Sequence, residues 1–254
     1  MRMDDLESRM RQLEYFHGLR ALPHTWLIVR VDGRRFSRMT ERRFSKPFDP
    51  VMYEHMLGVA RALMTELHGL YAYTVSDEVS VVLAPSWKLF DRELEKLVSL
   101  SASVATASFC LALGEAVQFD SRLWMGARLE DVVDYLRWRQ ADAHRSALNN
   151  WCYWTLRQEG QSVKEATRSL VKQTVADKNE LLFSRGINFN NVPTWQRRGS
   201  ALYCSDVEVS GFNPKTQQAT SSRRRRLVID AELPLKDEYS RMLERLLMAS
   251  AGGA

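Results

Sequence analysis

The chain has 254 residues, enough to bury a sizeable core in one large domain or in one domain with an appendage. Hydrophobic residues make up 45% of it and charged residues 26%, a balance typical of folded globular proteins that excludes global disorder. The net charge of +5 permits a polyanionic partner such as RNA or DNA without requiring one.

The three cysteines, Cys110, Cys152 and Cys204, are far apart and show no CxxC pairing. This spacing argues against a structural zinc site or a disulfide framework and favours a reducing compartment. The N-terminal stretch MRMDDLESRMRQLEYF is polar and charged, unlike a signal peptide. No apolar run approaches the roughly 20 residues that a membrane helix needs. We therefore expect a cytoplasmic protein with no membrane partner.

Apolar spacing predicts a mixed series of helices and strands. Helices are predicted at 4–17 and 50–68, where apolar residues recur every three or four positions. A long helix rich in small residues is predicted at 87–113, and one long helix or two abutting helices at 129–158. Capping signals at Ser162–Glu165 and Thr174–Asp177 predict two more helices. Strands are predicted at 25–31, on both sides of Ser76–Glu78, at 200–209 and at 226–230, and a short apolar segment lies near 122–125. The polar run NPKTQQATSSRRRR is predicted to be a mobile loop, and the tail 246–254 to be frayed.

Strands and helices alternate without the regular pattern of a parallel sheet. We expect an α+β fold with a palm-like (ferredoxin-like) antiparallel sheet and packed helices, then a helical region and a small C-terminal β extension. The predicted domain limits are 1–145 for the palm-like part, 146–205 for the helical region, and 206–254 for the basic extension with its frayed tail.

Acidic residues lie at two predicted strand ends. Asp32 follows a strand in VRVDGRRF, and Asp77 and Glu78 lie between two short strands in VSDEVSVV. Each stretch alone is explained by a turn, although Asp-Glu is a poor two-residue hairpin turn. If the first strand lies beside the hairpin, Asp32 and Asp77 converge. Two carboxylates with a backbone carbonyl are hard ligands that suit Mg²⁺, and a pair of such ions indicates phosphoryl transfer.

Basic and aromatic residues accompany these acids, each with two open interpretations. Arg34 and Arg35 either meet phosphates or form a solvated face, and Lys46 either holds a triphosphate or is an exposed loop lysine. The helix segment YLRWRQADAH carries Arg139 and His144, which either serve a nucleotide or are structural.

The stretch 176–199 is rich in amides and basic side chains. It either contacts RNA backbone and unpaired bases, with Phe189 or Trp195 as stacking faces, or is a polar surface loop with a packed tryptophan. The run Arg223–Arg226 either holds RNA phosphates or is an exposed charge run; four phosphate contacts would give steep salt dependence.

Eight motifs occur in one order: VRVDGRRF, FSKP, SDEVSVV, FDSR, DYLRWRQADAH, ADKNELLF, INFNN and RRGSALY. Over roughly 24–205 this ordered set resembles the tRNA-His guanylyltransferase family and its guanylyltransferase-like branch. The resemblance implies a polymerase-like palm that adds nucleotides to the 5′ end of tRNA in the 3′-to-5′ direction. It further implies two Mg²⁺ ions, ATP to activate a 5′-monophosphate, GTP or other NTPs as incoming nucleotides, and a homo-tetramer.

The resemblance also implies roles for individual residues. Asp32, Asp77 and the carbonyl of Gly33 correspond to metal ligands, and Glu78 to an acidic catalytic neighbour. The implied nucleotide-binding residues are Asp32, Gly33, Arg34, Arg35, Phe36, Ser37, Lys46, Ser76 and Asp77. Lys178 and Asn179 match the family's KNE motif near nucleotide and tRNA. Together with these two, the expected tRNA or nucleotide contacts are Arg122, Arg139, His144, Arg197, Arg198, Arg223 and Arg224.

The chain departs from the family pattern at two places. Arg35 and Ser37 replace asparagine and histidine in the first motif, and His144-Arg145-Ser146-Ala147 stands where the eukaryotic enzymes carry His-Ile-Asn-Asn. Those asparagines accompany addition of the extra guanylate to tRNA-His. Their absence favours template-dependent repair of 5′-truncated tRNA, with guanylate addition to tRNA-His as the alternative. A nucleotide cyclase that uses no RNA and a non-catalytic tRNA-binding module are the remaining alternatives.

Overall fold

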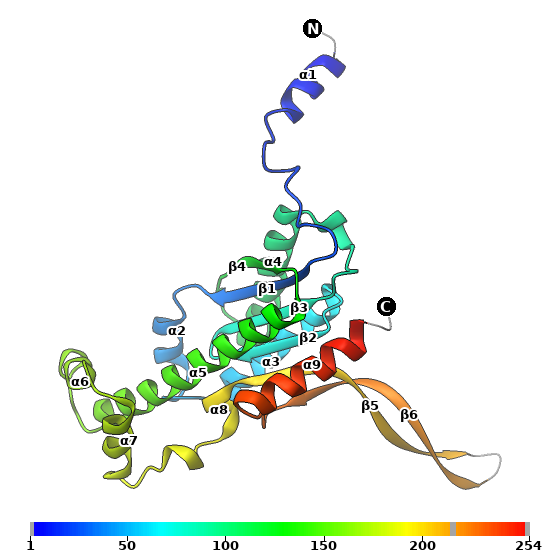
Figure 1. Ribbon diagram of the computed structural model, residues 1–254. Coiled ribbons are helices and arrows are strands. Elements are labelled where there is room, and N and C mark those ends of the chain that lie inside the picture. The colour runs from blue at the N-terminus through cyan, green and yellow to red at the C-terminus, as the bar shows by residue number, and fades with distance from the viewer. Residues whose placement is uncertain (1–2, 214–216, 252–254) are drawn as a thin grey trace.

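The computed structural model describes residues 3–213 and 217–251, and Figure 1 shows a central sheet flanked by helices. The elements in chain order are α1 (Met3–Arg11), β1 (Trp26–Gly33), α2 (Phe36–Arg43), α3 (Pro50–Glu66), β2 (Tyr71–Val75), β3 (Glu78–Leu83), η1 (Leu89–Arg92), α4 (Leu94–Leu113), β4 (Phe119–Gly126), α5 (Leu129–Gln158), α6 (Val163–Leu170), α7 (Val175–Phe183), η2 (Phe189–Asn191), α8 (Thr194–Arg198), β5 (Ser200–Asn213), β6 (Gln218–Asp230) and α9 (Lys236–Ala251).

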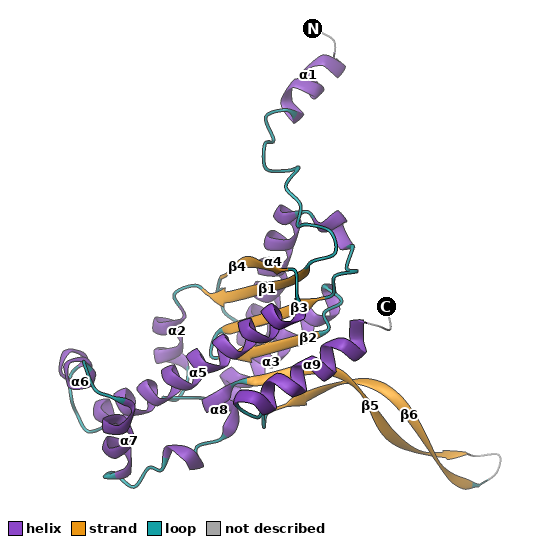
Figure 2. Ribbon diagram, in the orientation of Figure 1, coloured by secondary structure: helices purple, strands orange, loops and turns teal. Residues whose placement is uncertain are grey.

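The sheet has six strands in the order β4-β1-β3-β2-β5-β6, and every neighbouring pair is antiparallel. Side chains on a strand alternate between the two faces, so one strand serves two cores. In β1, Leu27, Val29 and Val31 pack in the core with α3 and α4, whereas Ile28 packs in the core with α5 and α9. Figure 2 shows α5 and α9 crossing one face of the sheet. The predicted α+β fold with an antiparallel sheet is confirmed.

A third hydrophobic cluster holds the helical end of the molecule. Leu148, Cys152 and Leu156 on the C-terminal half of α5 are buried with Ala166 on α6 and Leu182 on α7. Both predicted capping signals are present. Ser162 accepts a hydrogen bond from the Glu165 amide, and Thr174 accepts one from the Asp177 amide. The sequence therefore predicted the starts of α6 and α7 correctly.

The prediction of a mobile loop at residues 213–226 is wrong for most of that segment. Residues 218–226 belong to β6, which pairs with β5 from Ala201–Asp230 out to Asn213–Gln218, and the ribbon projects from the body (Figure 1). Asn213 is the last residue of β5, Gln217 is a turn residue, and residues 214–216 lie outside the described part. Polar ribbons satisfy their backbone groups through the strand ladder, so a polar sequence without apolar alternation does not exclude strands.

The tail predicted to fray is also largely helical. Residues 246–251 are the end of α9, and residues 252–254 lie outside the described part. Tyr239, Leu243 and Leu247 repeat every four positions along this helix and are fully buried against the sheet. That spacing is visible in the sequence and was a sufficient signal for the helix.

One helix corrects the expectation about apolar runs. The 20 residues Leu94–Leu113, which form α4, are long and apolar enough to cross a membrane by length and composition. In the structure, α4 lies against α3 and β4 and buries Leu97, Ala105 and Phe109 in the core. Packing against the sheet explains these buried residues, whereas Leu111 on the same helix is 87% exposed. The helix predicted at 87–113 is broken before Leu94, where Phe90 and Asp91 have positive φ.

The predicted domain limits fall inside continuous elements. The limit at 145/146 lies within α5, and the limit at 205/206 lies within β5. Strand β5 pairs with β2 through Tyr71–Tyr203 and Thr74–Ser200, so the β extension continues the central sheet.

Candidate functional site

Two acidic residues converge at one end of the sheet. Asp32 lies near the end of β1, opposite Glu78 on β3 and Asp120 on β4. The Gly33 amide donates a hydrogen bond to the Asp77 carbonyl at 3.1 Å, which ties the end of β1 to the β2–β3 turn. Antiparallel pairing of β1 with β3 thus brings Asp32 beside Asp77, as the sequence predicted.

The β2–β3 turn consists of Ser76 and Asp77, and Glu78 is already the first residue of β3. Ser76 has a φ of 53°, in the left-handed region, and its hydroxyl donates to Asp77 Oδ1 at 3.0 Å. The two acids are therefore not a turn pair. Asp77 is a turn residue, whereas Glu78 is a buried strand residue on the face of the sheet covered by α5.

Glu78 is paired with Arg139 on α5. Arg139 Nε donates to Glu78 Oε1 at 2.8 Å, and Arg139 Nη2 donates to Glu78 Oε2 at 2.5 Å. Only 12% of the Arg139 side chain and 8% of the Glu78 side chain are exposed. Arg139 was predicted to contact tRNA or nucleotide; the structure places its guanidinium in this buried ion pair.

Burial and mutual repulsion raise the pKa values of the two converging carboxylates. Burial, and then the nearby Asp32 charge, raises the pKa of Asp77 to about 6. Burial, and then Asp120, raises the pKa of Asp32, although Arg122 and Arg30 oppose the shift. Two carboxylates that repel each other in a partly buried site are stabilised as anions by a bound cation. The oxygen donors of Asp32 and Asp77, with the nearby Gly33 backbone, therefore fit Mg²⁺.

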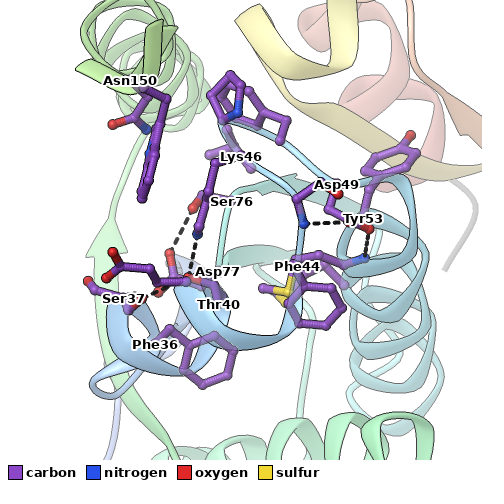
Figure 3. A pocket seen from close by; sticks show the side chains of 18 of the residues that line it. Phe36, Ser37, Thr40, Phe44, Lys46, Asp49, Tyr53, Ser76, Asp77 and Asn150 are labelled. Atoms are coloured by element: carbon purple, nitrogen blue, oxygen red, sulfur yellow. Dashed lines mark hydrogen bonds between the residues drawn. The ribbon is translucent and has the colours of Figure 1, made fainter. Parts of the chain in front are cut away.

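A cavity of about 310 Å³ opens beside Asp77, between α2, the loop to α3, the β2–β3 turn and α5. Figure 3 shows Ser37, Lys46, Ser76 and Asp77 around it. A second cavity of about 230 Å³ shares Ser76 and Asp77 with the first and also contacts Asp32 and Glu78. The Ser76–Asp77 turn thus lies at both cavities, with one of them lined by the acidic residues and the other by Lys46.

Lys46 is the basic group of the larger cavity. Its Nζ donates to Thr40 Oγ1 at 2.7 Å, drawn in Figure 3, and lies 5.6 Å from the ring centroid of Trp154. Burial lowers the pKa of Lys46, while Glu41 and Asp77 oppose the shift. The sequence indicated Lys46 and Asp77 as site residues but gave no sign of Thr40, Glu41 and Trp154 as neighbours of Lys46.

The cavity also has an aromatic wall that the sequence did not reveal. Tyr53 stacks on Trp195 with ring centroids 4.4 Å apart, and Tyr153 and Trp154 come from α5. These residues are far apart in the chain, and only the Trp195 ring was proposed as a stacking face. No local pattern distinguishes them from core aromatics.

The motif VRVDGRRF contributes to both the hydrophobic core and the lining of the larger cavity. Phe36 is 3% exposed and packs against Phe109 and Phe119. A Cβ at Gly33 would lie 2.5 Å from the Phe36 ring, which explains the glycine. Arg34 and Arg35 are exposed at the start of α2, and neither borders the two cavities described above.

Arg122 and His144 lie on different elements. Arg122 is on β4 directly across from Arg30 and pairs with Asp120 at 3.1 Å. His144 lies on α5, its ring 5.4 Å from that of Phe189, and burial and the Arg197 charge lower its pKa.

The remaining predicted contacts divide into internal and exposed groups. Arg197 is 8% exposed and donates to the Val192 carbonyl at 2.6 Å, and Arg198 donates to the Leu233 carbonyl at 2.9 Å. Both arginines therefore brace α8. Lys178 and Asn179 are partly exposed on α7, where Asn179 borders a separate cavity of about 340 Å³. Arg223 and Arg224 are exposed on the β6 ribbon.

Comparison with known proteins agrees with this arrangement. The tRNAHis guanylyltransferase family model (Thg1) matches residues 7–130, and the model of the Thg1 C-terminal domain matches residues 130–236. The tRNA(His) guanylyltransferase of Neurospora crassa is 38% identical over 197 residues, which cover 72% of this chain and 67% of that protein. A Dictyostelium discoideum protein named a probable tRNA(His) guanylyltransferase is 36% identical over 223 residues, or 82% of this chain and 85% of that one.

Solved structures show the same fold. The tRNA(His) guanylyltransferase of Saccharomyces cerevisiae superposes with a TM-score of 0.68 at 30% identity, covering 76% of this chain and 90% of that one. A bacterial Thg1-like protein in complex with GTP gives a TM-score of 0.69 at 25% identity, over 96% of this chain and 99% of that one. The same kind of protein in complex with ATP gives 0.76 at 24% identity, over 95% and 99%. The chain therefore belongs to the tRNA-His guanylyltransferase family of nucleotidyltransferases.

Proposed function

We propose that this protein adds guanylate to the 5′ end of tRNA-His by nucleotidyl transfer in the 3′-to-5′ direction. The observation that carries the proposal is the convergence of Asp32 and Asp77 beside a cavity lined by Lys46. Relatives 36–38% identical to this chain carry the name of that activity. Family membership favours this reaction over a nucleotide cyclase and over a non-catalytic tRNA binder.

The residues around the cavity divide the work of binding. Lys46, Ser37 and Ser76 line the larger cavity and would hold the triphosphate of a nucleotide there. Asp32 and Asp77 would hold two Mg²⁺ with the Gly33 carbonyl, and the ions would neutralise phosphate charge and acidify the attacking hydroxyl. Fixing the nucleotide against the tRNA end supplies the acceleration through positioning and electrostatics.

The proposed reaction has two stages. An oxygen of the tRNA 5′-monophosphate attacks the α-phosphorus of ATP, which forms an adenylylated 5′ end and releases pyrophosphate. The 3′-hydroxyl of GTP then attacks the activated 5′-phosphorus, loses its proton, and displaces AMP. A 5′-triphosphate enters at the second stage and releases pyrophosphate instead.

Template-dependent repair of 5′-truncated tRNA is the second candidate. Residues 145–147 depart from the asparagine-containing motif described above, and the departures lie at the site: Ser146 and Ala147 line the acidic cavity with Asp32 and Asp77. In repair, Watson–Crick pairing with the opposite strand would select the nucleotide.

An extension assay separates the two candidates. Full-length and 5′-truncated tRNAs, carrying either C or A at the opposite position, are incubated with labelled NTPs, ATP and Mg²⁺. Guanylate added opposite A on tRNA-His supports the proposed function. Addition confined to positions that can pair supports repair, and a labelled cyclic product formed without RNA would overturn both.

Substituting Lys46 with methionine is expected to raise the KM for the incoming nucleotide by about 10- to 100-fold, the effect of losing one charged hydrogen bond to phosphate. The variant keeps the length of the side chain, and its kcat is expected to change less than its KM. Steady-state kinetics with varied GTP measure both. Lys164→Met, on exposed α6, is the matched control. Equal KM values for the two variants would contradict the role of Lys46.

The projecting ribbon has one face on which arginines lie opposite acids in the strand ladder. Directly opposed residues on paired strands point to the same face. Arg225 on β6 lies opposite Asp206 on β5, and Arg223 lies opposite Glu208. The charges on this face compensate each other.

The other ribbon face carries uncompensated positive charge. Arg226 lies opposite Ser205, and Arg224 lies opposite Val207. Both arginines are exposed and have no acidic residue directly across the ladder. This face is the one suited to RNA phosphates.

Replacing Arg224 and Arg226 with glutamine is expected to weaken tRNA binding and to reduce the slope of log K against log salt by about 2. The matched control, Arg223→Gln with Arg225→Gln, removes the same charge from the compensated face and is expected to change the slope less. Filter binding at several salt concentrations measures both. Equal slopes for the two double variants would show that the run acts only through net charge.

A further inference from the structure

The ion pair between Glu78 and Arg139 separates Glu78 from the other two carboxylates at the end of the sheet. Asp32, Asp77 and Glu78 all border the same cavity, and Glu78 lies directly opposite Asp32 in the strand ladder. Even so, across residues 3–213 and 217–251 these three do not form a group whose ligand oxygens lie within 4.8 Å of one another. The three acids therefore do not converge on one point, and Glu78 is the one whose carboxylate is paired with a guanidinium.

Both oxygens of Glu78 are already engaged. The guanidinium of Arg139 meets them in a two-pronged contact at 2.8 and 2.5 Å, and the Ser80 hydroxyl lies 3.4 Å from Oε1. A carboxylate that accepts two parallel N–H bonds from a planar guanidinium has a fixed orientation. The positive charge of the guanidinium also disfavours a divalent cation at the same oxygens.

Arg139 is itself held in place from three directions. It lies on α5, a helix packed across the sheet, so its backbone position is set by the core. Its guanidinium lies 4.7 Å from the Trp138 ring centroid, and Nη2 lies 3.4 Å from Asp142 Oδ2. With 12% of its side chain exposed, Arg139 has little freedom to release Glu78.

We propose that Arg139 is a positioning residue that holds Glu78 away from Asp32 and Asp77, so that the two Mg²⁺ are bound by two carboxylates and not by three. Mg²⁺ accepts six ligands and is usually bound by one or two carboxylates together with substrate phosphates, so a third carboxylate would leave fewer positions for nucleotide oxygens. The proposal rests on the proposed function for the identity of the reaction, whereas the metal-binding part of its test needs neither tRNA nor nucleotide.

The test measures Mn²⁺ binding to the full chain in the absence of nucleotide, by electron paramagnetic resonance of the free ion. In Arg139→Met, the released Glu78 is expected to join the site and to tighten Mn²⁺ binding by about 10-fold, within the range seen when groups around metal ligands are changed. Arg139→Lys keeps the positive charge but cannot make the two parallel hydrogen bonds of a guanidinium, so its Mn²⁺ affinity is expected to lie between those of Arg139→Met and the natural protein. Arg137→Met, two positions away on the exposed side of α5, is the matched control.

A double variant, Glu78→Gln with Arg139→Met, keeps the proposal testable if Arg139→Met does not fold. It removes both charges of the pair, and its Mn²⁺ affinity is expected to lie within about 3-fold of the natural protein. A loss of 10-fold or more would make Glu78 a ligand and overturn the proposal. Unchanged affinity in a folded Arg139→Met would overturn it as well.

Nucleotide addition at saturating Mn²⁺ is the second readout. Arg139→Met is expected to add guanylate about 10- to 100-fold more slowly despite its tighter metal binding, a combination that simple loss of stability does not produce. If the natural protein adds no nucleotide, the proposed function fails, while the Mn²⁺ titrations still decide the role of Arg139.

Discussion

Replacing Asp77 with asparagine is expected to slow 5′-guanylate addition by about 1000-fold, the upper range for loss of one preorganised electrostatic group. The substitution preserves the shape of the side chain and the hydrogen bond from Ser76, but it removes one of two charges that would bind the cation. Single-turnover extension of labelled tRNA measures the rate. Asp134→Asn, on an exposed position of α5, is the control. Activity within tenfold of the natural protein would rule out Asp77 as a metal ligand.

The same variant is expected to be more stable than the natural protein at pH 8 in EDTA. Because burial and Asp32 raise the pKa of Asp77 to about 6, the folded state binds more protons than the unfolded state between about pH 4 and pH 6. The contribution of Asp77 to stability therefore decreases as pH rises through that window. Above it, asparagine is expected to add about 1 to 3 kcal/mol.

Denaturant unfolding at pH 4 and pH 8 checks this expectation. The difference between the two proteins should shrink toward pH 4, where Asp77 is protonated in the folded state and about half protonated in the unfolded state. Adding Mg²⁺ at pH 8 should stabilise the natural protein more than the variant, because a ligand that binds only the folded state raises its stability. A variant that is less stable at pH 8 would contradict the electrostatic account.

Replacing Gly199 with alanine is expected to lower the free energy of unfolding by about 3 to 5 kcal/mol, the sum of backbone strain and overpacking. Gly199 joins α8 to β5 with φ 73° and ψ −170°, a conformation that essentially only glycine adopts. A Cβ there would lie 2.6 Å from the Thr74 carbonyl oxygen and 2.7 Å from the Tyr73 hydroxyl. Since β2 leads directly into the Ser76–Asp77 turn, guanylate addition should fall as well.

The variant Gly114→Ala separates the cost of backbone strain at positive φ from the cost of a steric clash of the added Cβ. Gly114 ends α4 with φ 71°, but no atom lies within 4 Å of a Cβ built on it. Its substitution is expected to lower stability by only about 1 to 2 kcal/mol. Thermal and urea unfolding of both variants give the comparison. If Gly199→Ala lowers the free energy of unfolding no more than Gly114→Ala does, the close approach of a Cβ at Gly199 to β2 has no energetic cost.

Much of the fold follows from short-range signals. The β-branched run at 25–31 became β1, and the capping pairs Ser162–Glu165 and Thr174–Asp177 begin α6 and α7. Such signals are readable because caps, periodicity and turns depend on residues within a few positions of one another. The missed elements have other causes. The β5–β6 ribbon is stabilised by the hydrogen-bond ladder between two strands of polar sequence, which no apolar alternation marks. The helix α9, in contrast, does have apolar residues at helical spacing, and these are buried against the sheet.

The candidate site was predictable in its chemistry and less so in its arrangement. The residue types at the two strand ends indicated a metal-binding pair, and the ordered motifs indicated the family. Several residues expected to contact RNA or nucleotide have structural contacts: Arg197 and Arg198 donate to backbone carbonyls, and Phe36 packs in the core while it also lines the larger cavity. A basic or aromatic residue in a motif has the same appearance in the sequence whether it faces a ligand or a core.

The sequence by itself determined that this chain carries Asp32, Asp77 and Glu78 at strand ends, within a set of motifs specific to one enzyme family. Only the tertiary structure decided that Asp77 lies in the turn at both cavities, while Glu78 lies in the strand and is neutralised by Arg139, 61 positions along the chain. The physical reason is that α5 crosses one face of the sheet. Whether a carboxylate on that face meets a guanidinium depends on how helix and sheet pack, which no local pattern encodes.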